Sequence, residues 1–309
     1  MQREDFFYDS RDGENKIHAV RWTPDEGEVK GIFQIVHGMA EYIDRYEDLA
    51  AFMTEKGWVV IGEDHLGHGK SIPVGGTPGY FCKVDPATVV VRDVHRLKKL
   101  TQEMYPGVPI VLLGHSMGSF IARNYISRYG TGIQAAIIMG TGMQPRGLIK
   151  VSKAMVAVQK LFLGEKHVAR ALNNMGFGAY NKRIENPRTD FDWLSVNQKN
   201  VDKYMMDPLC GFVFTLNGFG TLFELIDRLY DKNNLAKVPN DLPLLYVSGA
   251  EDPVGDYGKA PGLAMESLKE MGVKDMTVKI YPGDRHEILN EDDKDTVKED
   301  LYQWIMSKV

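Results

Sequence analysis

The side chain best suited to covalent chemistry is a serine in a turn flanked by glycines. The segment reads Gly114-His115-Ser116-Met117-Gly118. A serine in this pattern is a nucleophile when a strand leads into the turn and a helix leaves it. The strained turn exposes the hydroxyl and leaves room only for small residues two positions away on either side. The free N–H of Met117 at the start of the helix would face a developing oxyanion.

The neighbouring residues supply the elements that this turn needs. Residues 110–113 form a short apolar run of the kind found in buried strands. The residues after Ser116 place Phe120, Ile121 and Tyr125 on one helical side, and this pattern ends near Gly130. A chance match is common in a chain with 31 glycines. The strand before and the helix after favour a real nucleophile at Ser116.

The same alternation of short apolar runs and longer helical patterns extends along much of the chain. It predicts an α/β fold with a mostly parallel central sheet and helices on both faces. The first thirty residues are typical of an antiparallel hairpin that enters this sheet, and residues 276–281 alternate as an edge strand does. The other expected strands cover residues 32–36, 58–61, 110–113, 135–139 and 244–247.

Between about residues 145 and 239 no strand pattern is found. This stretch is amphipathic and rich in aromatic residues. We expect a helical cap over one end of the sheet, with residues 1–144 and 240–309 forming the core and 145–239 the cap. Its apolar faces could equally form the core of a second small domain. The amphipathic segment 151–163 is also a candidate for transient contact with a membrane surface.

Composition narrows the class and the compartment of the protein. The chain has 309 residues, 37 Lys and Arg against 42 Asp and Glu, and a net charge of −5. This balance argues against nucleic-acid binding, which needs a basic surface. The two cysteines, Cys82 and Cys210, form no paired pattern and suit a reducing compartment. The first residues lack the apolar segment of a signal peptide, so we expect a cytoplasmic protein.

With His37-Gly38-Met39 upstream and Asp64-His65-Leu66-Gly67-His68-Gly69-Lys70-Ser71 between, the Gly-His-Ser-Met-Gly turn resembles the α/β-hydrolase superfamily. Within it, the pattern is similar to the monoacylglycerol lipase and lysophospholipase branch. The likeness covers nearly the whole chain and is weakest in the insertion. It implies an α/β-hydrolase fold and hydrolysis of esters with lipid-like acyl chains, with no cofactor.

A serine hydroxyl needs an imidazole to remove its proton, and the imidazole needs a carboxylate to orient it. The resemblance implies His286, in the loop after the last strand, as the base, and Asp252, after the strand at 244–247, as the acid. The chain order of Ser116, Asp252 and His286 is the order of the superfamily. Glu251 and Asp284 remain competing carboxylates.

The resemblance also implies that the backbone amides of Met39 and Met117 form the oxyanion hole, with Gly38 allowing a special backbone angle. Glu41 and Arg45 match polar positions of the monoacylglycerol lipase pattern, and we expect them to bind substrate. Met143 and Trp193 are expected in an apolar acyl pocket. Ala40 and Tyr42 depart from the family pattern, which leaves lysophospholipids and generic carboxylic esters open.

Several alternatives have to be weighed. Asp64, His65 and His68 have zinc-like spacing, but the resemblance implies a loop held by internal hydrogen bonds, and we expect no metal. A haloalkane dehalogenase would need an aspartate in place of Ser116. A proline iminopeptidase-like peptidase would share all three catalytic residues. A ligand-binding protein on this scaffold could keep them without turnover.

Overall fold

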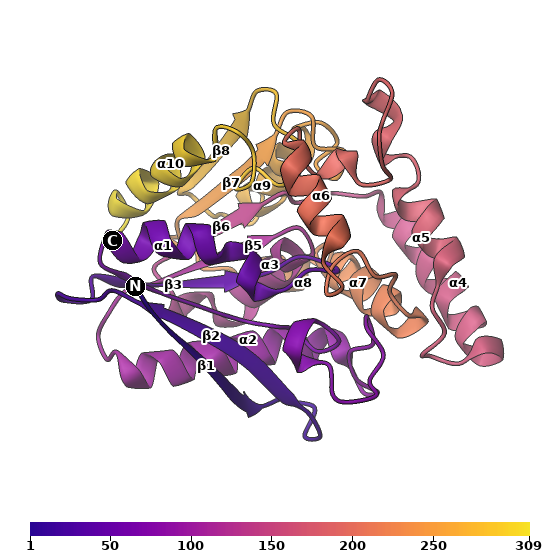
Figure 1. Cartoon of the computed structure of the whole chain (residues 1–309), viewed down its shortest axis with the longest axis horizontal. Coiled ribbons are helices and arrows are strands. Elements are labelled where there is room, and N and C mark those ends of the chain that lie inside the picture. The colour runs from indigo at the N-terminus through magenta and orange to yellow at the C-terminus, as the bar shows by residue number, and fades with distance from the viewer.

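A computed structural model describes all 309 residues of the chain. Eight strands form one sheet in the order β1-β2-β4-β3-β5-β6-β7-β8 (Figure 1). β1 pairs antiparallel with β2, and β2 antiparallel with β4, while the remaining neighbours are parallel. The strands are β1 (Gln2–Asp9), β2 (Lys16–Thr23), β3 (Gly31–Val36), β4 (Trp58–Glu63), β5 (Ile110–His115), β6 (Ala135–Met139), β7 (Leu244–Gly249) and β8 (Met276–Tyr281).

The burial of the strands explains their sequences. Every residue of β3, β4, β5, β6 and β7 is buried, as in parallel strands covered on both faces, where continuous apolar runs are favoured over alternation. β8 lies at the edge of the sheet and is buried only at its last residue. The predicted mostly parallel sheet, its antiparallel entry hairpin and its edge strand are confirmed.

Helices cover both faces of the sheet and divide the core in two. One apolar cluster of 46 buried residues includes side chains of α2 (Pro86–Met104), α3 (Met117–Tyr129) and α9 (Ala260–Lys269). The other, of 24 residues, includes side chains of α1 (Glu47–Glu55) and α10 (Lys294–Met306). The parallel strands are therefore fixed from both sides, so the loops at their ends are held in place.

The chain between β6 and β7 contains five α-helices. They are α4 (Arg146–Leu163), α5 (Arg170–Phe177), α6 (Gln198–Met206), α7 (Leu216–Arg228) and α8 (Lys232–Leu235). Of these, α4 and α5 lie beyond one end of the sheet, while α7 and α8 pack against α3 (Figure 1). Leu216, Phe219 and Leu225 of α7 belong to the same cluster as α2 and α3. The division into a core and a cap at residues 145 and 239 stays a prediction.

Short 3-10 helices lie at Ile43–Tyr46, Gly69–Ser71, Gly130–Gly132, Tyr180–Arg183 and Asp192–Leu194.

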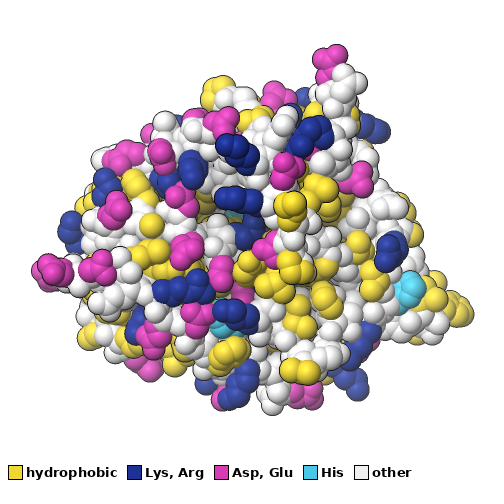
Figure 2. Space-filling model, in the orientation of Figure 1, with side chains coloured by type: hydrophobic (Ala, Val, Ile, Leu, Met, Phe, Trp, Pro, Cys, Tyr) yellow, Lys and Arg dark blue, Asp and Glu magenta, His cyan; other side chains and the backbone are white.

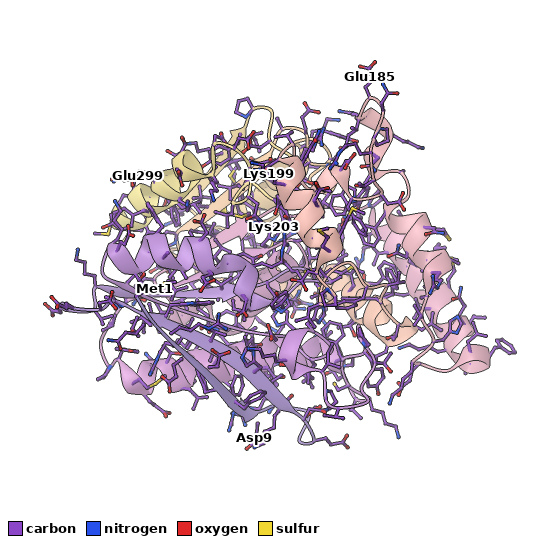
Figure 3. The ribbon with its side chains drawn as sticks, viewed as in Figure 1. Met1, Asp9, Glu185, Lys199, Lys203 and Glu299 are labelled. Carbon is purple, nitrogen blue, oxygen red and sulfur yellow. The ribbon has the colours of Figure 1, made fainter.

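The loop that carries Glu185 projects from the body of the molecule, and Lys199 and Lys203 lie on α6 (Figure 3). Charged side chains of both signs are spread over this face among hydrophobic patches (Figure 2). None of the helices is long and apolar enough to span a bilayer.

Candidate active site

Ser116 lies in the sharp turn between β5 and α3 and has a strained backbone. Its φ is 55° and its ψ is −120°, a conformation that a residue with a side chain rarely adopts. A β-carbon at Gly114 would collide with the carbonyl of Gly118, and one at Gly118 with the carbonyl of Val36. Ser116 N–H donates to the carbonyl of Met139 at 3.0 Å. The glycines are therefore required because β5, α3 and β3 meet at this turn.

Asp252 and His286 are brought together from the loops after β7 and β8. His286 Nδ1 lies 3.0 Å from Asp252 Oδ1, and both side chains are buried. The second carboxylate oxygen accepts the hydroxyl of Ser248 at 3.1 Å, and Oδ1 also accepts Val254 N–H at 2.9 Å. Burial alone would raise the pKa of Asp252, but His286 and these donors hold it below its usual value. Asp252 is thus an ionised partner for the imidazole.

The two competing carboxylates lie elsewhere. Glu251 is exposed on the surface, next to Asp252 in the chain. Asp284 is buried, and burial and neighbouring carboxylates raise its pKa to about 7. No hydrogen bond joins either side chain to His286, so the geometry favours Asp252.

Ser116 and His286 line one large cavity of about 710 Å³. No direct hydrogen bond joins the two side chains, and the only one among Ser116, Asp252 and His286 is between the acid and the imidazole. Catalytic hydrogen bonds are often long without substrate and shorten when it binds. Most of the lining is apolar, and it comes from the β3 loop, α3, α4, α5 and α7, together with the segment around residues 190–213.

The loop after β3 passes directly beside the serine. A β-carbon built on Gly38 would lie 3.1 Å from Cβ of Ser116. Met39 and Met117 both line the cavity. We expected the special backbone conformation at Gly38, and this prediction is wrong. The residue of this loop with a positive φ is Ala40, at 53°. The loop reverses at Ala40 and returns to Glu41, whose Oε1 accepts Gly38 N–H at 2.6 Å.

The four residues expected to bind substrate have different positions. Trp193 lines the cavity, with its ring centroid 5.2 Å from that of His286. Glu41 also reaches the lining, but its carboxylate is paired with Arg45 at 2.7 Å. Arg45 lies outside the lining because Glu41 and Glu287 hold its guanidinium. Met143 likewise lies outside it, with its sulfur 3.6 Å from the Arg123 guanidinium.

The loop that carries His286 is joined to the segment before α6 by several hydrogen bonds. Arg285 Nη1 donates to the carbonyls of Asp192 and Ser195 at 2.7 and 3.1 Å. Glu287 N–H donates to the carbonyl of Leu194 at 2.8 Å. The carboxylate of Glu291 accepts the hydroxyl of Ser195 at 2.6 Å. The position of His286 therefore depends on this segment as well as on the sheet.

The Asp64, His65 and His68 group is held by internal hydrogen bonds. Asp64 accepts the N–H groups of Ile43 and Lys70 at 2.9 and 2.8 Å and contacts His18 Nδ1 at 2.8 Å. The His65 ring packs against that of His37, with centroids 4.0 Å apart and the ring planes tilted by 30°. Burial lowers the pKa of His65 to about 4 and that of His68 to about 3, so both rings are neutral.

Two residues near the site have no motif that could identify them from sequence. A β-carbon at Gly140, just after β6, would lie 3.0 Å from Cε1 of His286. A side chain at this position would displace the imidazole. In the sequence, the only sign of this requirement is a glycine directly after a strand. Glu287 is buried and pairs with Arg45. Its partner is 242 residues away in the chain, so spacing gives no indication of the pair.

The sheet order and the strained serine between strand and helix define the α/β-hydrolase class. The chain belongs to the Hydrolase_4 family, described as serine aminopeptidase, S33, whose model matches residues 27–293. A highly thermostable carboxyl esterase from Bacillus coagulans, solved in complex with glycerol, is 32% identical. It superposes with a TM-score of 0.90, over 100% of this chain and 99% of that one.

Relatives of known activity agree with this class. Mouse monoglyceride lipase is 28% identical over 298 residues, covering 93% of this chain and 86% of the relative. Monoacylglycerol lipase of Mycolicibacterium smegmatis is 27% identical over 286 residues, covering 93% and 91%. The predicted α/β-hydrolase fold and the resemblance to the monoacylglycerol lipase branch are confirmed.

Proposed function

We propose that this protein is a serine hydrolase that cleaves carboxylic esters of lipid-like acyl chains through an acyl-enzyme. Ser116 Oγ attacks the ester carbonyl while His286 Nε2 takes its proton, and Asp252 holds the Nδ1–H of the imidazole. The amides of Met39 and Met117 stabilise the oxyanion. His286 returns the proton to the departing alcohol, and a water molecule then releases the acid by the same steps.

One observation carries this proposal: a strained serine faces the same cavity as an imidazole that is hydrogen-bonded to a buried carboxylate. Strain at a serine costs free energy and is retained where exposure of the hydroxyl is needed. The esterase and lipase relatives support ester hydrolysis over the other reactions of this class.

The cavity favours an uncharged ester. Its volume of about 710 Å³ and mostly apolar lining suit a medium or long acyl chain, at about 0.8 kcal/mol for each buried methylene. No lysine or arginine lines it, whereas Asp190 does. A phosphate headgroup would lose hydration there without gaining a cation. We therefore propose monoacylglycerol-like esters rather than lysophospholipids, which agrees with the glycerol bound to the Bacillus coagulans esterase.

The proposal is tested with a fluorophosphonate label. We expect the label on Ser116, and we expect Ser116→Ala to abolish labelling and lower kcat by a factor on the order of 10⁴ or more. Ser127→Ala, on the same helix but outside the cavity, is the matched control and should label like the wild type. Labelling of a folded Ser116→Ala protein would refute Ser116 as the nucleophile.

The same assay separates the two alternatives. A peptidase would cleave N-terminal amino-acid amides and ignore the length of an acyl chain. A binding protein would hold lipid esters with turnover barely above the uncatalysed rate. The family description names an aminopeptidase, so an amide substrate belongs in the panel beside esters of increasing acyl length.

A cytoplasmic location and contact with a membrane surface are further parts of this proposal. Cys82 and Cys210 are free and buried, which suits a reducing compartment. The exposed apolar side chains of α4 suit the surface of a bilayer.

A further inference from the structure

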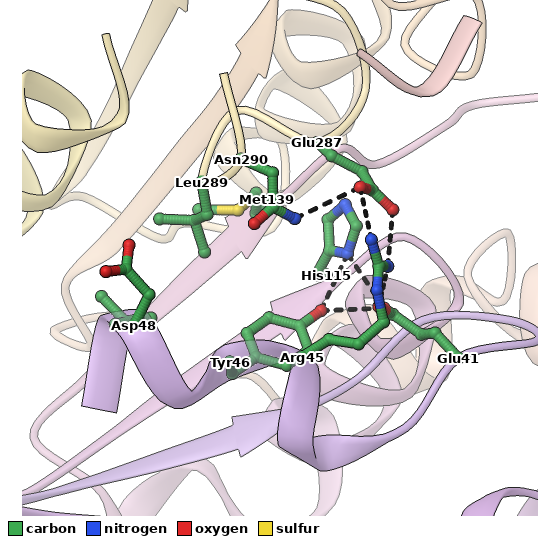
Figure 4. Close-up of a pocket in the computed structure, with 10 residues that line it drawn as sticks. Glu41, Arg45, Tyr46, Asp48, His115, Met139, Glu287, Leu289 and Asn290 are labelled. Carbon is green, nitrogen blue, oxygen red and sulfur yellow. Dashed lines mark hydrogen bonds and ion pairs between the residues drawn. The ribbon is translucent and has the colours of Figure 1, made fainter. Parts of the chain in front are cut away.

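Next to Ser116 and His286 lies a group of buried polar side chains, to which the triad mechanism assigns no role. It contains Glu41, Arg45, Tyr46, His115 and Glu287 (Figure 4). They come from the segment after β3, the end of β5 and the loop after β8. The cavity that they help to line has a volume of only about 10 Å³, so the network is closely packed.

The charges of this network balance only if His115 is a cation. Arg45 donates to Glu41 at 2.7 Å and to both oxygens of Glu287 at 2.7 Å each. Against the effect of burial, Arg45 holds the pKa of Glu287 below its usual value, and the hydrogen bond with His115 together with the charge of Arg45 does the same for Glu41. Two carboxylates and one guanidinium leave one negative charge, and an unpaired buried charge is strongly destabilising.

The hydrogen bonds of His115 lead to the same conclusion. His115 Nε2 lies 3.3 Å from the backbone carbonyl oxygen of His286, which only accepts, so this nitrogen carries a proton. Tyr46 donates its single hydroxyl proton to Glu41 Oε1 at 2.9 Å. His115 Nδ1 lies 2.9 Å from the Tyr46 oxygen and 3.2 Å from Glu41 Oε1, and both can then only accept. The second nitrogen therefore carries a proton as well.

We infer that His115 is a positioning residue whose imidazolium joins Glu41 to the backbone carbonyl of His286. One cation then fixes the loop that holds the predicted oxyanion donor Met39 and the loop that holds the predicted base. Arg45 reinforces this link through Glu287, the next residue after His286. The inference rests on the proposed function for the roles of Met39 and His286.

Every charged or titratable group that faces His115 is part of this link. Glu41, Arg45 and Tyr46 face it from the segment after β3, and Glu287 and the His286 ring, with its centroid 4.9 Å away, from the loop after β8. Asp252 is bonded to the far side of His286. Burial opposes a charge on His115, but Glu41 overcomes this and raises the pKa of His115 above its usual value.

Nuclear magnetic resonance tests the proton count directly. With ¹⁵N-labelled histidine, two of the eight histidines should keep protons on both ring nitrogens at pH 7.5: His115, and His18, whose two ring nitrogens each contact a carboxylate. Only the signals of His115 should disappear in His115→Gln. Tyr46→Phe gives a second assignment, because it changes the hydrogen bonding of this ring. A neutral tautomer for His115 at pH 7.5 would overturn the inference, whether or not the protein is an ester hydrolase.

Kinetics on a water-soluble p-nitrophenyl ester tests the positioning role. His115→Gln should lower kcat by about 10- to 100-fold and change KM by less than about twofold, as expected when a catalytic group is misplaced. Wild-type kcat should decline at alkaline pH as the imidazolium loses its proton, and this decline should be absent in the variant. His95→Gln is the control, because His95 stacks on Tyr129 outside the site, with centroids 3.7 Å apart.

The outcomes separate the two proposals. Fluorophosphonate labelling that survives in Ser116→Ala refutes the proposed function. A folded His115→Gln protein with wild-type kcat and an unchanged pH profile refutes the positioning role while the serine mechanism stands.

Discussion

At the residue scale, we expect the charge of the cavity lining to decide which headgroup the site accepts. Asp190 lines it on one side, and the carboxylates of Glu41 and Glu287, which also reach it, are already paired with Arg45. A substrate that carries a phosphate would meet carboxylates and apolar side chains but no cation. An uncharged alcohol needs only hydrogen-bond partners, and the amide side chains of Asn173 and Gln144 line the cavity.

We therefore predict strong discrimination between headgroups on the same acyl chain. The kcat/KM for a monoacylglycerol should exceed that for the matching lysophosphatidate by at least about 100-fold, or roughly 2.7 kcal/mol. Asn173→Lys places a cation in the lining and should narrow this ratio about tenfold. Asn173→Gln, which adds no charge, is the control. Equal rates on both substrates would contradict the prediction.

The sequence could predict candidate site residues where side chains follow expected strands. Ser116, Asp252 and His286 each follow a strand, and parallel strands bring their carboxyl ends to one edge of the sheet. Arg45 was expected to bind substrate but lies outside the cavity lining. Its sequence motif does not reveal that Glu287 holds its guanidinium. Pairs formed through space by distant residues leave no local pattern.

At the element scale, α4 has a buried apolar side and also exposes large apolar side chains on its outer side. Ile149 and Val156 are buried, but Leu161 and Phe162 are 83% and 82% exposed. The charged residues of α4 are all basic: Arg146, Lys150, Lys153 and Lys160. Hydrophobic side chains also form the tip at the right of Figure 2, on the side where α4 and α5 lie in Figure 1. A basic amphipathic helix of this kind suits an anionic bilayer surface.

We predict that the protein binds vesicles of mixed phosphatidylglycerol and phosphatidylcholine through α4. Replacing Leu161 and Phe162 together by serine should weaken cosedimentation at least about tenfold, because each apolar side chain contributes roughly 1.5–3 kcal/mol when buried. Hydrolysis of a water-soluble ester should not change. Leu263→Ser, an exposed leucine of α9, is the control. Equal vesicle binding by all three proteins would exclude this surface.

The packing of the helices between β6 and β7 could not be predicted from the sequence. Strong periodicity predicted helices there, and helices are found. The packing of α7 against α3 and α2 depends on side chains such as Phe219 and Leu225, whose partners lie far along the chain. Amphipathic patterns identify an apolar face but not what it contacts.

At the scale of the whole molecule, stability depends on two buried carboxyls between the N-terminal hairpin and α2. Burial raises the pKa of Glu63 and of Asp93 to about 8. The Tyr8 hydroxyl contacts both Glu63 Oε2 and the carbonyl of Asp93. Its single proton serves only one of these contacts, so a protonated Glu63 satisfies the other. In the unfolded chain both carboxyls ionise near pH 4.

We predict that the free energy of unfolding falls by about 1–2 kcal/mol between pH 6.5 and 8. The folded protein still binds protons that the unfolded chain has released, so stability is lost as pH rises through about 8. The buried His37, His65 and His68 act in the opposite direction as pH falls through about 6.5, because burial lowers their pKa and only the unfolded chain takes up protons there.

Urea unfolding at the two pH values checks this prediction. The double variant Glu63→Gln and Asp93→Asn should lose at least half of the fall, while the exposed Glu28→Gln should retain all of it. Equal slopes in wild type and double variant would show that other groups are responsible.

The hydrogen bonds from Arg285, Glu287 and Glu291 to residues 192–196 also affect thermal inactivation. These hydrogen bonds join the loop that holds His286 to the segment before α6. Neither segment can therefore open without breaking them. The two segments thus form one cooperative unit of local unfolding, separate from the sheet. On gradual heating, enzymatic function would disappear when this unit opens, at a temperature below that at which the strands separate.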